Sequence, residues 1–352
     1  MTLSLRDGSP GPPWERPIAG AFERLVVTSE LLAGNPLGDP ADRPLWIYLP
    51  PGVERDSAER FPAIYVIQGF TGQVDMWLNR NFREPTMIER LDHLFSDRSV
   101  PRAVIVFVDA WTSFGGSQFL DSPSTGPYMS YLCDEVVPFV DDNFPVIPDA
   151  GHRGLTGKSS GGYGAMVVPM MRPDTFGALA SHAGDALFEV AYAPEFRVTA
   201  RALRDDFEGS WDVFWERFDE MEWPIGADKF WPLIEDYGYA ACYTPDPERP
   251  GKAILPYDHN GRLVDHVWER WLAWDPVRMA PKHGDALAGM KLIYLDSGTS
   301  DEYYLDLGAR AFADELNELG VDHRLELFAG KHGGIGHRYP RAIGALAEAL
   351  SP

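Results

Sequence analysis

The sequence has few cysteines and no long hydrophobic run. Its 352 residues include two cysteines, Cys133 and Cys242, which are too few for a disulfide framework or a zinc cluster. No apolar stretch approaches the roughly 20 residues that cross a bilayer. The first residues also lack the basic region and the apolar run of a signal peptide. We therefore expect a cytoplasmic protein.

Basic residues are scarce as well. The chain has 31 Lys and Arg against 53 Asp and Glu, which gives a formal net charge of −22. A chain this acidic repels phosphate backbones and anionic lipid surfaces, so neither nucleic acid nor a membrane is an expected partner. Hydrophobic residues make up 45% and charged residues 24%, which indicates a globular protein and excludes a disordered or fibrous one.

The chain does contain an alternation of strand-like and helix-like segments. Residues 21–29 and 44–49 form an early pair of predicted strands, and further buried strands are expected at 62–67, 103–109, 153–157, 178–182, 291–296 and 324–328. Helices are expected at 86–96, 128–143, 160–171, 303–319 and 339–350. This alternation predicts an α/β fold with a mostly parallel sheet and helices on both of its faces.

One long segment departs from this alternation. Residues 185–284 show no clear strand pattern and are rich in aromatic side chains interleaved with charges: Phe188, Phe196, Phe207, Trp211, Phe214, Trp215, Phe218, Trp223, Phe230, Trp231, Tyr237, Tyr239, Tyr243, Trp268 and Trp271. We interpret this segment as a largely helical cap inserted between two core strands. The predicted organisation is an N-terminal arm at 1–20, a core at 21–184 and 285–352, and the cap at 185–284.

The motif that indicates chemistry is Gly-x-Ser-x-Gly at residues 157–161. It directly follows a predicted strand and directly precedes a predicted helix, which is the setting of a nucleophile elbow. In such an elbow Ser159 lies on a sharp turn, and the small residues two positions away on either side prevent a backbone clash. The N–H groups of the following helix then point toward the place where an oxyanion would form.

A phosphate-binding loop is the main alternative interpretation of the same residues. Residues 157–159 (Gly-Lys-Ser) also match the end of that motif, which requires a glycine five positions before Gly157. That position holds His152, and Gly151 and Gly154 are out of register. We therefore reject a phosphate-binding loop.

A nucleophilic serine needs a histidine base and an acid that orients it, and after an elbow these follow in the order acid, then histidine. Asp301 lies in the loop after the predicted strand at 291–296 and is the preferred acid, ahead of Asp296 at the end of that strand. A glycine-rich loop follows the last predicted strand. It contains His332, the first choice for the base, and His337, the second choice.

The loop at residues 68–72 follows another predicted strand and is expected to complete the oxyanion hole, with the N–H of Phe70 pairing with that of Ser160. The alternative interpretation of this loop is an ordinary turn without a catalytic role. Five residues are added as candidate substrate-binding residues: Gln68, Trp111, Lys158, His182 and Asp185. For His182 and Asp185, a structural pair is at least as good an interpretation.

These motifs together resemble an esterase family that includes enterochelin esterases, S-formylglutathione hydrolases and the antigen 85 proteins. The segments at 35–39, 47–52, 116–128, 157–165, 298–301 and 330–332 carry the resemblance, which extends from about residue 22 onward. It implies an α/β-hydrolase fold with Ser159, Asp301 and His332 as the catalytic triad. The sequence departs from the family at Gln68, where histidine is frequent, and at Pro169, which we expect to kink or shorten its helix.

The function expected from the sequence is a serine esterase that forms an acyl-enzyme and needs no metal or organic cofactor. Its partner would be a small-molecule ester with an apolar or aromatic portion. Two alternatives stay open. One is an acyltransferase that uses the same triad with an alcohol as acceptor, and the other is a catalytically silent binding module of the same fold.

Overall fold

An eight-stranded sheet forms the centre of the computed structural model, which describes residues 17–80, 84–220 and 230–352. The strand order is β1-β2-β4-β3-β7-β8-β9-β10. These strands are β1 (Ala21–Thr28), β2 (Asp42–Leu49), β3 (Ala63–Ile67), β4 (Val104–Val108), β7 (Arg153–Lys158), β8 (Ala178–His182), β9 (Leu292–Gly298) and β10 (Arg324–Phe328). β2 is antiparallel to β1 and to β4, whereas all pairs from β4 to β10 are parallel. The predicted α/β architecture is therefore confirmed.

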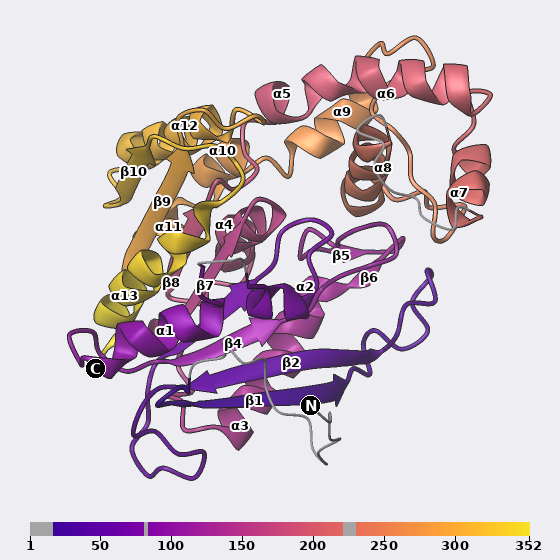
Figure 1. The fold of residues 1–352 in the computed structure, drawn as a ribbon. Coiled ribbons are helices and arrows are strands. Elements are labelled where there is room, and N and C mark those ends of the chain that lie inside the picture. Colours follow the sequence, from indigo (N-terminus) through magenta and orange to yellow (C-terminus); the bar gives the residue numbers. More distant parts are fainter. Residues whose placement is uncertain (1–16, 81–83, 221–229) are drawn as a thin grey trace, which may run out of the picture.

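Helices cover both faces of this sheet (Figure 1). The α-helices are α1 (Met87–Ser96), α2 (Tyr128–Ser130), α3 (Val137–Asn143), α4 (Ser160–Met171), α5 (Phe188–Ala191), α6 (Ala193–Asp206), α7 (Trp211–Asp219), α8 (Trp231–Tyr243), α9 (Asp265–Leu272), α10 (Pro276–Met279), α11 (Gly284–Ala288), α12 (Leu305–Glu318) and α13 (Tyr339–Leu350). Short 3-10 helices occupy Val74–Leu78, Ala150–His152, Ala280–Lys282 and Ile335–Arg338. A two-stranded ribbon, β5 (Asp121–Ser122) with β6 (Gly126–Pro127), was not predicted.

The central strands are buried on both faces. In β3, Ile64 and Val66 pack in the hydrophobic cluster that contains α1 and α13, whereas Tyr65 and Ile67 pack in the cluster that contains α3, α4 and α12. Every residue of β3 and of β4 is buried. Burial on both faces explains why these strands occur in the sequence as continuous apolar runs and not as alternating ones.

Two predicted helices differ in detail from the structure. The segment expected as one helix at 128–143 consists of α2, a π-helical stretch at Tyr131–Val136, and α3. α4 extends to Met171 and is not shortened by Pro169. Because Pro169 is near the end of α4, its missing N–H removes one bond from the last turn only, and the N–H of Arg172 still donates to Val168 O at 2.8 Å.

The segment between β8 and β9 contains α5 to α11 and, within its described residues, no β-strand of the sheet. Figure 1 shows α5 to α9 grouped at one end of the molecule, opposite β1 and β2. A helical insertion is therefore present where the sequence predicted one. Residues 1–16 of the predicted arm lie outside the described residues, and so does Trp223 of the predicted cap.

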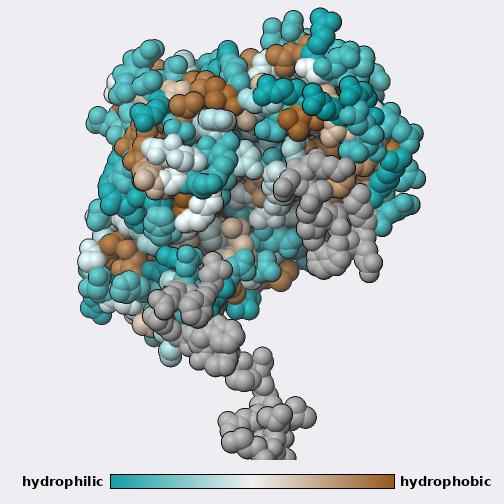
Figure 2. Space-filling view, turned by 45° about the horizontal axis from the view of Figure 1, so that its top comes forward, coloured by the Kyte–Doolittle hydropathy of each residue, from teal (hydrophilic) through white to brown (hydrophobic). Residues whose placement is uncertain are grey.

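None of the described helices combines the length and the apolar character that crossing a membrane requires. On the face drawn in Figure 2, hydrophilic residues predominate and hydrophobic ones form separate patches. This surface agrees with the excess of acidic residues in the composition.

Candidate active site

Ser159 lies on a strained turn between β7 and α4. Its backbone angles are φ 59° and ψ −127°, which a residue with a side chain adopts only when its surroundings hold it there. The Ser159 N–H donates to the carbonyl of His182 at 3.0 Å. A Cβ on Gly157 would lie 2.5 Å from the Gly161 backbone, and one on Gly161 would lie 2.6 Å from Ile67 O. Both glycines of the motif are therefore required by close backbone approach.

The structure brings Ser159, His332 and Asp301 into one hydrogen-bonded chain. His332 Nε2 lies 3.1 Å from Ser159 Oγ, and His332 Nδ1 lies 2.8 Å from Asp301 Oδ2. The Asp301 side chain is fully buried, and the backbone N–H of Tyr303 donates to its other oxygen at 2.9 Å. In this arrangement Asp301 fixes the orientation of the imidazole, whose second nitrogen meets the serine hydroxyl.

The loop that carries His332 is held by a residue that the sequence did not single out. Glu302 accepts a hydrogen bond from the backbone N–H of His332 at 3.0 Å, and its other oxygen lies 2.9 Å from Lys331 Nζ. The His332 N–H and the Lys331 ammonium lower the pKa of Glu302 to about 2. Its position directly after Asp301 in the acid loop was the available signal.

The two predicted oxyanion donors, Phe70 and Ser160, lie close together in the fold. Phe70 and Ser160 border the same space, and Ser160 is the first residue of α4. Among the described residues, neither the backbone N–H of Phe70 nor that of Ser160 has a hydrogen-bond acceptor. Both donors are thus available to an external oxygen.

A cavity of about 420 Å³ opens at Ser159. Its wall combines core residues with residues of the segment between β8 and β9, including Lys158, Ser159, Asp185, Tyr192, Glu195, Trp231, Glu235, Asp236, Tyr239, Tyr303 and His332. No group of three or more His, Cys, Asp or Glu side chains among the described residues could hold a metal ion. The cavity therefore places Ser159 and His332 in one wall together with aromatic and acidic side chains.

Two of the candidate substrate-binding residues line this cavity. Burial lowers the pKa of Lys158, although the nearby acid Asp301 opposes this effect. Burial raises the pKa of Asp185, whose Oδ2 accepts hydrogen bonds from Tyr192 Oη at 2.8 Å and from Gln118 Nε2 at 3.3 Å. Both side chains thus line the cavity, but the Asp185 carboxyl already accepts hydrogen bonds from other side chains of the protein.

Gln68 and Trp111 are placed elsewhere. Neither is among the described residues that line the cavity, and both border a separate small hollow with Phe70. The Gln68 amide lies between Val108 O, at 2.5 Å, and Ala110 N, at 2.8 Å, and satisfies both when its nitrogen donates to the former. Gln68 therefore anchors the start of the loop at residues 68–72 to the core.

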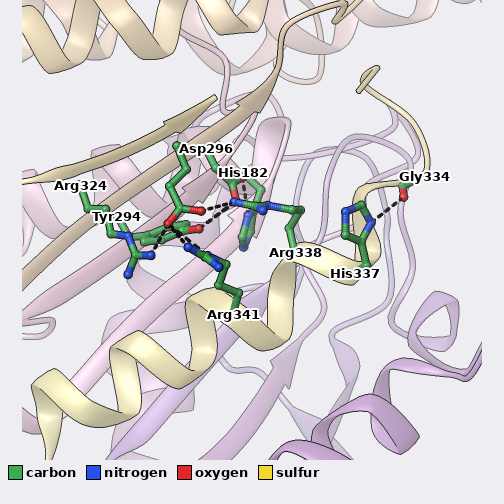
Figure 3. A network of polar contacts seen from close by, with 9 residues as sticks. His182, Tyr294, Asp296, Arg324, Gly334, His337, Arg338 and Arg341 are labelled. Atoms are coloured by element: carbon green, nitrogen blue, oxygen red, sulfur yellow. Dashed lines mark hydrogen bonds and ion pairs between the residues drawn. The ribbon is translucent and has the colours of Figure 1, made fainter. Parts of the chain in front are cut away.

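His182 forms a second Asp–His pair, away from the cavity. It is completely buried, its Nδ1 lies 2.7 Å from Asp296 Oδ1, and its ring packs against Tyr339 at 4.5 Å between ring centroids. Figure 3 shows this pair, with the Arg338 guanidinium reaching Asp296 Oδ2 at 2.9 Å. His182 therefore acts on the site only through its backbone carbonyl, which accepts from Ser159.

His337, the second choice for the base, points away from Ser159. Its Nδ1 lies 3.2 Å from the carbonyl oxygen of Gly334 in its own loop (Figure 3). The structure therefore separates the two histidines of this loop, and His332 is the one in contact with Ser159.

Several cavity residues were missed by the sequence analysis. Tyr303 packs edge-on against the His332 ring with 4.9 Å between ring centroids. Trp231, Glu235 and Tyr239 line the cavity from α8. Their spacing of four residues predicts a shared helix face, but the sequence did not indicate that this face meets Ser159.

Comparisons with known proteins identify the family and the fold. The model of the family described as "Putative esterase" matches residues 40–334. The uncharacterized protein YbbA of Bacillus subtilis is 30% identical over 173 residues, which cover 46% of this chain and 62% of that protein. The chain therefore spans less than two thirds of this relative's length.

Solved structures share the fold at low sequence identity. A ferulic acid esterase has a TM-score of 0.60 and 15% identity, with 95% of this chain and 100% of that chain covered. The S-formylglutathione hydrolase of Agrobacterium tumefaciens has a TM-score of 0.55 and 16% identity, with 96% and 98% covered. The fold is that of the α/β-hydrolases. Because the family model spans most of the sequence, the chain belongs to this "Putative esterase" family of carboxylic ester hydrolases.

Proposed function

We propose that this protein is a serine esterase that hydrolyses small-molecule carboxylic esters through an acyl-enzyme on Ser159. Asp301 and His332 are the other two members of the proposed triad, and the N–H groups of Phe70 and Ser160 form the proposed oxyanion hole. The observation that carries the proposal is the hydrogen-bonded chain from Asp301 through His332 to Ser159 Oγ, at 2.8 and 3.1 Å, on the wall of a cavity.

The proposed reaction has two halves. In the first, His332 takes the Ser159 proton as Oγ attacks the ester carbonyl, and the Phe70 and Ser160 N–H groups stabilise the oxyanion. His332 then gives its proton to the leaving alcohol, and the acyl group stays on Ser159. In the second half, His332 takes a proton from water, the resulting hydroxide attacks the acyl-enzyme, and the proton returns to Ser159 Oγ as the acid leaves.

We further propose that residues 21–184 and 285–352 form the catalytic core and that residues 185–284 form a cap which shapes the substrate site. Tyr192, Trp231 and Tyr239 of this segment line the cavity together with Ser159. Aromatic walls favour a substrate with an apolar or aromatic portion, which agrees with the ferulic acid named for one structural neighbour.

A fluorophosphonate probe tests the proposal. Incubation with the full chain, followed by intact and peptide mass measurement, is expected to show stoichiometric labelling of the peptide that contains Ser159. Ser159→Ala should lose this labelling, and its kcat on p-nitrophenyl acetate should fall by roughly 10⁵–10⁶-fold. The purified products should be the free acid and the alcohol.

The controls separate folding from chemistry. Ser159→Ala should keep the circular dichroism spectrum and the unfolding midpoint of the native chain. Labelling at another serine, or an Ser159→Ala variant that retains ester hydrolysis, would overturn the assignment of the nucleophile. An ester formed with an added alcohol, in place of the free acid, would show acyl transfer and not hydrolysis.

A further inference from the structure

The cap presents one aromatic and acidic face to the cavity. Trp231, Glu235 and Tyr239 follow one another at intervals of four residues on α8 and line the cavity. Tyr192 and Glu195, at the start of α6, line it as well. We call these five residues the acidic aromatic wall. The rings of Tyr192 and Tyr239 pack at a tilt of 31° with 4.7 Å between their centroids, so these two residues form a packed part of the wall.

Glu235 is the unusual member of this wall. It is 8% exposed, its carboxyl forms no ion pair among the described residues, and the donor beside it is the Trp231 indole. Burial and the nearby carboxyls of Asp236 and Asp185 raise the pKa of Glu235 well above its usual value, and only the Trp231 indole opposes this effect appreciably. A buried carboxyl surrounded by other carboxyls favours its protonated form, and a nearby cation favours its charged form.

Two cationic side chains, Arg90 and Lys158, are among the described residues that line the cavity. Arg90 pairs with Glu84 at 3.8 Å, and the charges that act on Lys158 are those of Asp301, Asp185 and Glu302. The described carboxyls are also not grouped as ligands for a metal ion. A positively charged group of an organic ligand would stabilise the charged form of Glu235, and the faces of neighbouring aromatic rings attract such a group as well.

We propose that the acidic aromatic wall binds a positively charged group of the substrate, so that the protein hydrolyses esters bearing an ammonium or quaternary ammonium group in preference to neutral esters of the same shape. This inference rests on the proposed function and names its substrate class. Glu235 is the specificity-determining residue: its carboxylate attracts the cation, and the Trp231 and Tyr239 rings contact the alkyl groups around it.

Matched pairs of esters test the inference on the unmodified protein. On the alcohol side, acetylcholine is compared with 3,3-dimethylbutyl acetate, in which carbon replaces the charged nitrogen. On the acyl side, the p-nitrophenyl ester of 4-(trimethylammonio)butanoate is compared with that of 5,5-dimethylhexanoate. For at least one pair, kcat/KM of the cationic ester is expected to exceed that of its neutral partner by roughly tenfold or more.

Glu235→Gln removes the carboxylate and keeps the shape of the side chain. It should reduce the ratio of kcat/KM for the cationic ester to kcat/KM for the neutral ester to less than about threefold, mainly through a higher KM for the cationic ester. The matched control is Glu216→Gln, which removes the same charge from an exposed position of the cap. It should leave the preference unchanged.

The preference should also depend on pH in a defined direction. Because Glu235 has a raised pKa, its carboxyl is neutral at low pH, and the cation preference should increase as pH rises and Glu235 ionises. The other acids that face it are Asp185, Glu195 and Asp236, with Tyr303 across the cavity. The ionisation of the proposed catalytic histidine affects kcat/KM of both esters equally, so it cancels in the ratio of the two values. In Glu235→Gln this ratio should no longer change with pH.

The outcomes separate the two proposals. Equal or faster hydrolysis of the neutral ester in both pairs by the native chain would overturn the inference and leave the esterase proposal intact. A preference that survives Glu235→Gln would also overturn it. Absence of hydrolysis of every ester, together with absence of fluorophosphonate labelling, would instead refute the proposed function.

Discussion

The molecule contains two Asp–His pairs of nearly the same internal geometry in different surroundings. Asp301 and His332 are 2.8 Å apart, and Asp296 and His182 are 2.7 Å apart. The other ring nitrogen of His332 meets Ser159 Oγ, whereas Nε2 of His182 is buried and has no hydrogen-bond partner among the described residues. An Asp–His pair alone therefore does not identify a candidate catalytic histidine. The group that contacts the second ring nitrogen distinguishes the two pairs.

The acids of the two pairs differ as well. Asp296 lies within β9 and also accepts from Arg338 at 2.9 Å and Tyr294 at 3.3 Å, so a cation compensates its charge. Asp301 lies in the loop after the strand and is held mainly by the histidine and by a backbone N–H. One pair thus ties strands and α13 together, and the other leaves its histidine available at the cavity.

The largest expected effect comes from removing each histidine in turn. His332→Ala should reduce kcat by roughly 10⁴–10⁶-fold with little change in the free energy of unfolding, because the residue is partly exposed and is the proposed catalytic base. His182→Ala should instead lower that free energy by about 3–5 kcal/mol and keep kcat of the folded protein within about tenfold. Urea unfolding and initial rates on p-nitrophenyl acetate measure both quantities.

The matched control is His337→Ala, which removes the second histidine of the same loop and should change neither quantity appreciably. A drop in kcat of folded His182→Ala as large as that of His332→Ala would contradict the separation of the two pairs.

A smaller effect is expected when each acid becomes an amide. Asp301→Asn should lower kcat by about 10⁴-fold, because an amide no longer selects the tautomer that accepts the serine proton. Asp296→Asn should lower the free energy of unfolding by about 3–5 kcal/mol, because it leaves Arg338 without its buried carboxylate. Measured by esterase rates and urea unfolding, Asp301→Asn should lose activity and keep its stability, and Asp296→Asn should do the reverse. A loss of activity in folded Asp296→Asn would contradict this prediction.

The smallest effect concerns the outer end of the structural pair. Arg338 also contacts Glu326 at 2.6 Å, and although burial opposes ionisation, hydrogen bonds from Arg341 and Arg338 lower the pKa of Glu326 to about 2. A depressed pKa stabilises the fold above the ordinary value of 4.5, and this contribution is lost as pH falls from 4.5 toward 2.

Glu326→Gln should therefore lower the free energy of unfolding by no more than about 1 kcal/mol at pH 7, because the Glu326 side chain is 19% exposed and solvent screens its ion pairs. Urea unfolding at pH 7, 5 and 3 should show the difference from the native chain shrinking between pH 5 and pH 3. A difference that is constant over this range would indicate a packing effect, and kcat should not change.

Much of the fold could be predicted because its elements are defined locally. β8, β10, α4 and α13 begin and end at the predicted residues, since buried apolar runs and helical periodicity mark them directly. The loop position of Asp301 and the glycine-rich surroundings of His332 also indicated which residues gather at the carboxyl ends of the strands. The close contact among Ser159, His332 and Asp301 follows from that common edge.

The remainder could not be predicted because it depends on long-range packing. His182 follows a core strand just as a site residue would, and only its contact with Asp296, 114 positions away, shows that it belongs to the interior. Gln68 is similar, since its amide is used by Val108 and Ala110. For Glu235, helical spacing defines a face but not the surface that this face meets.

The position of the segment between β8 and β9 has a consequence for how this protein can change over time. β8 and β9 are hydrogen-bonded neighbours, so the chain leaves the sheet and returns to it at adjacent points whatever lies between them. The entropy of closing such a loop grows only slowly with its length. Residues can therefore be inserted, lost or replaced there with little effect on the register of the strands that carry Ser159 and Asp301. Selection can then act on substrate choice separately from the reaction itself.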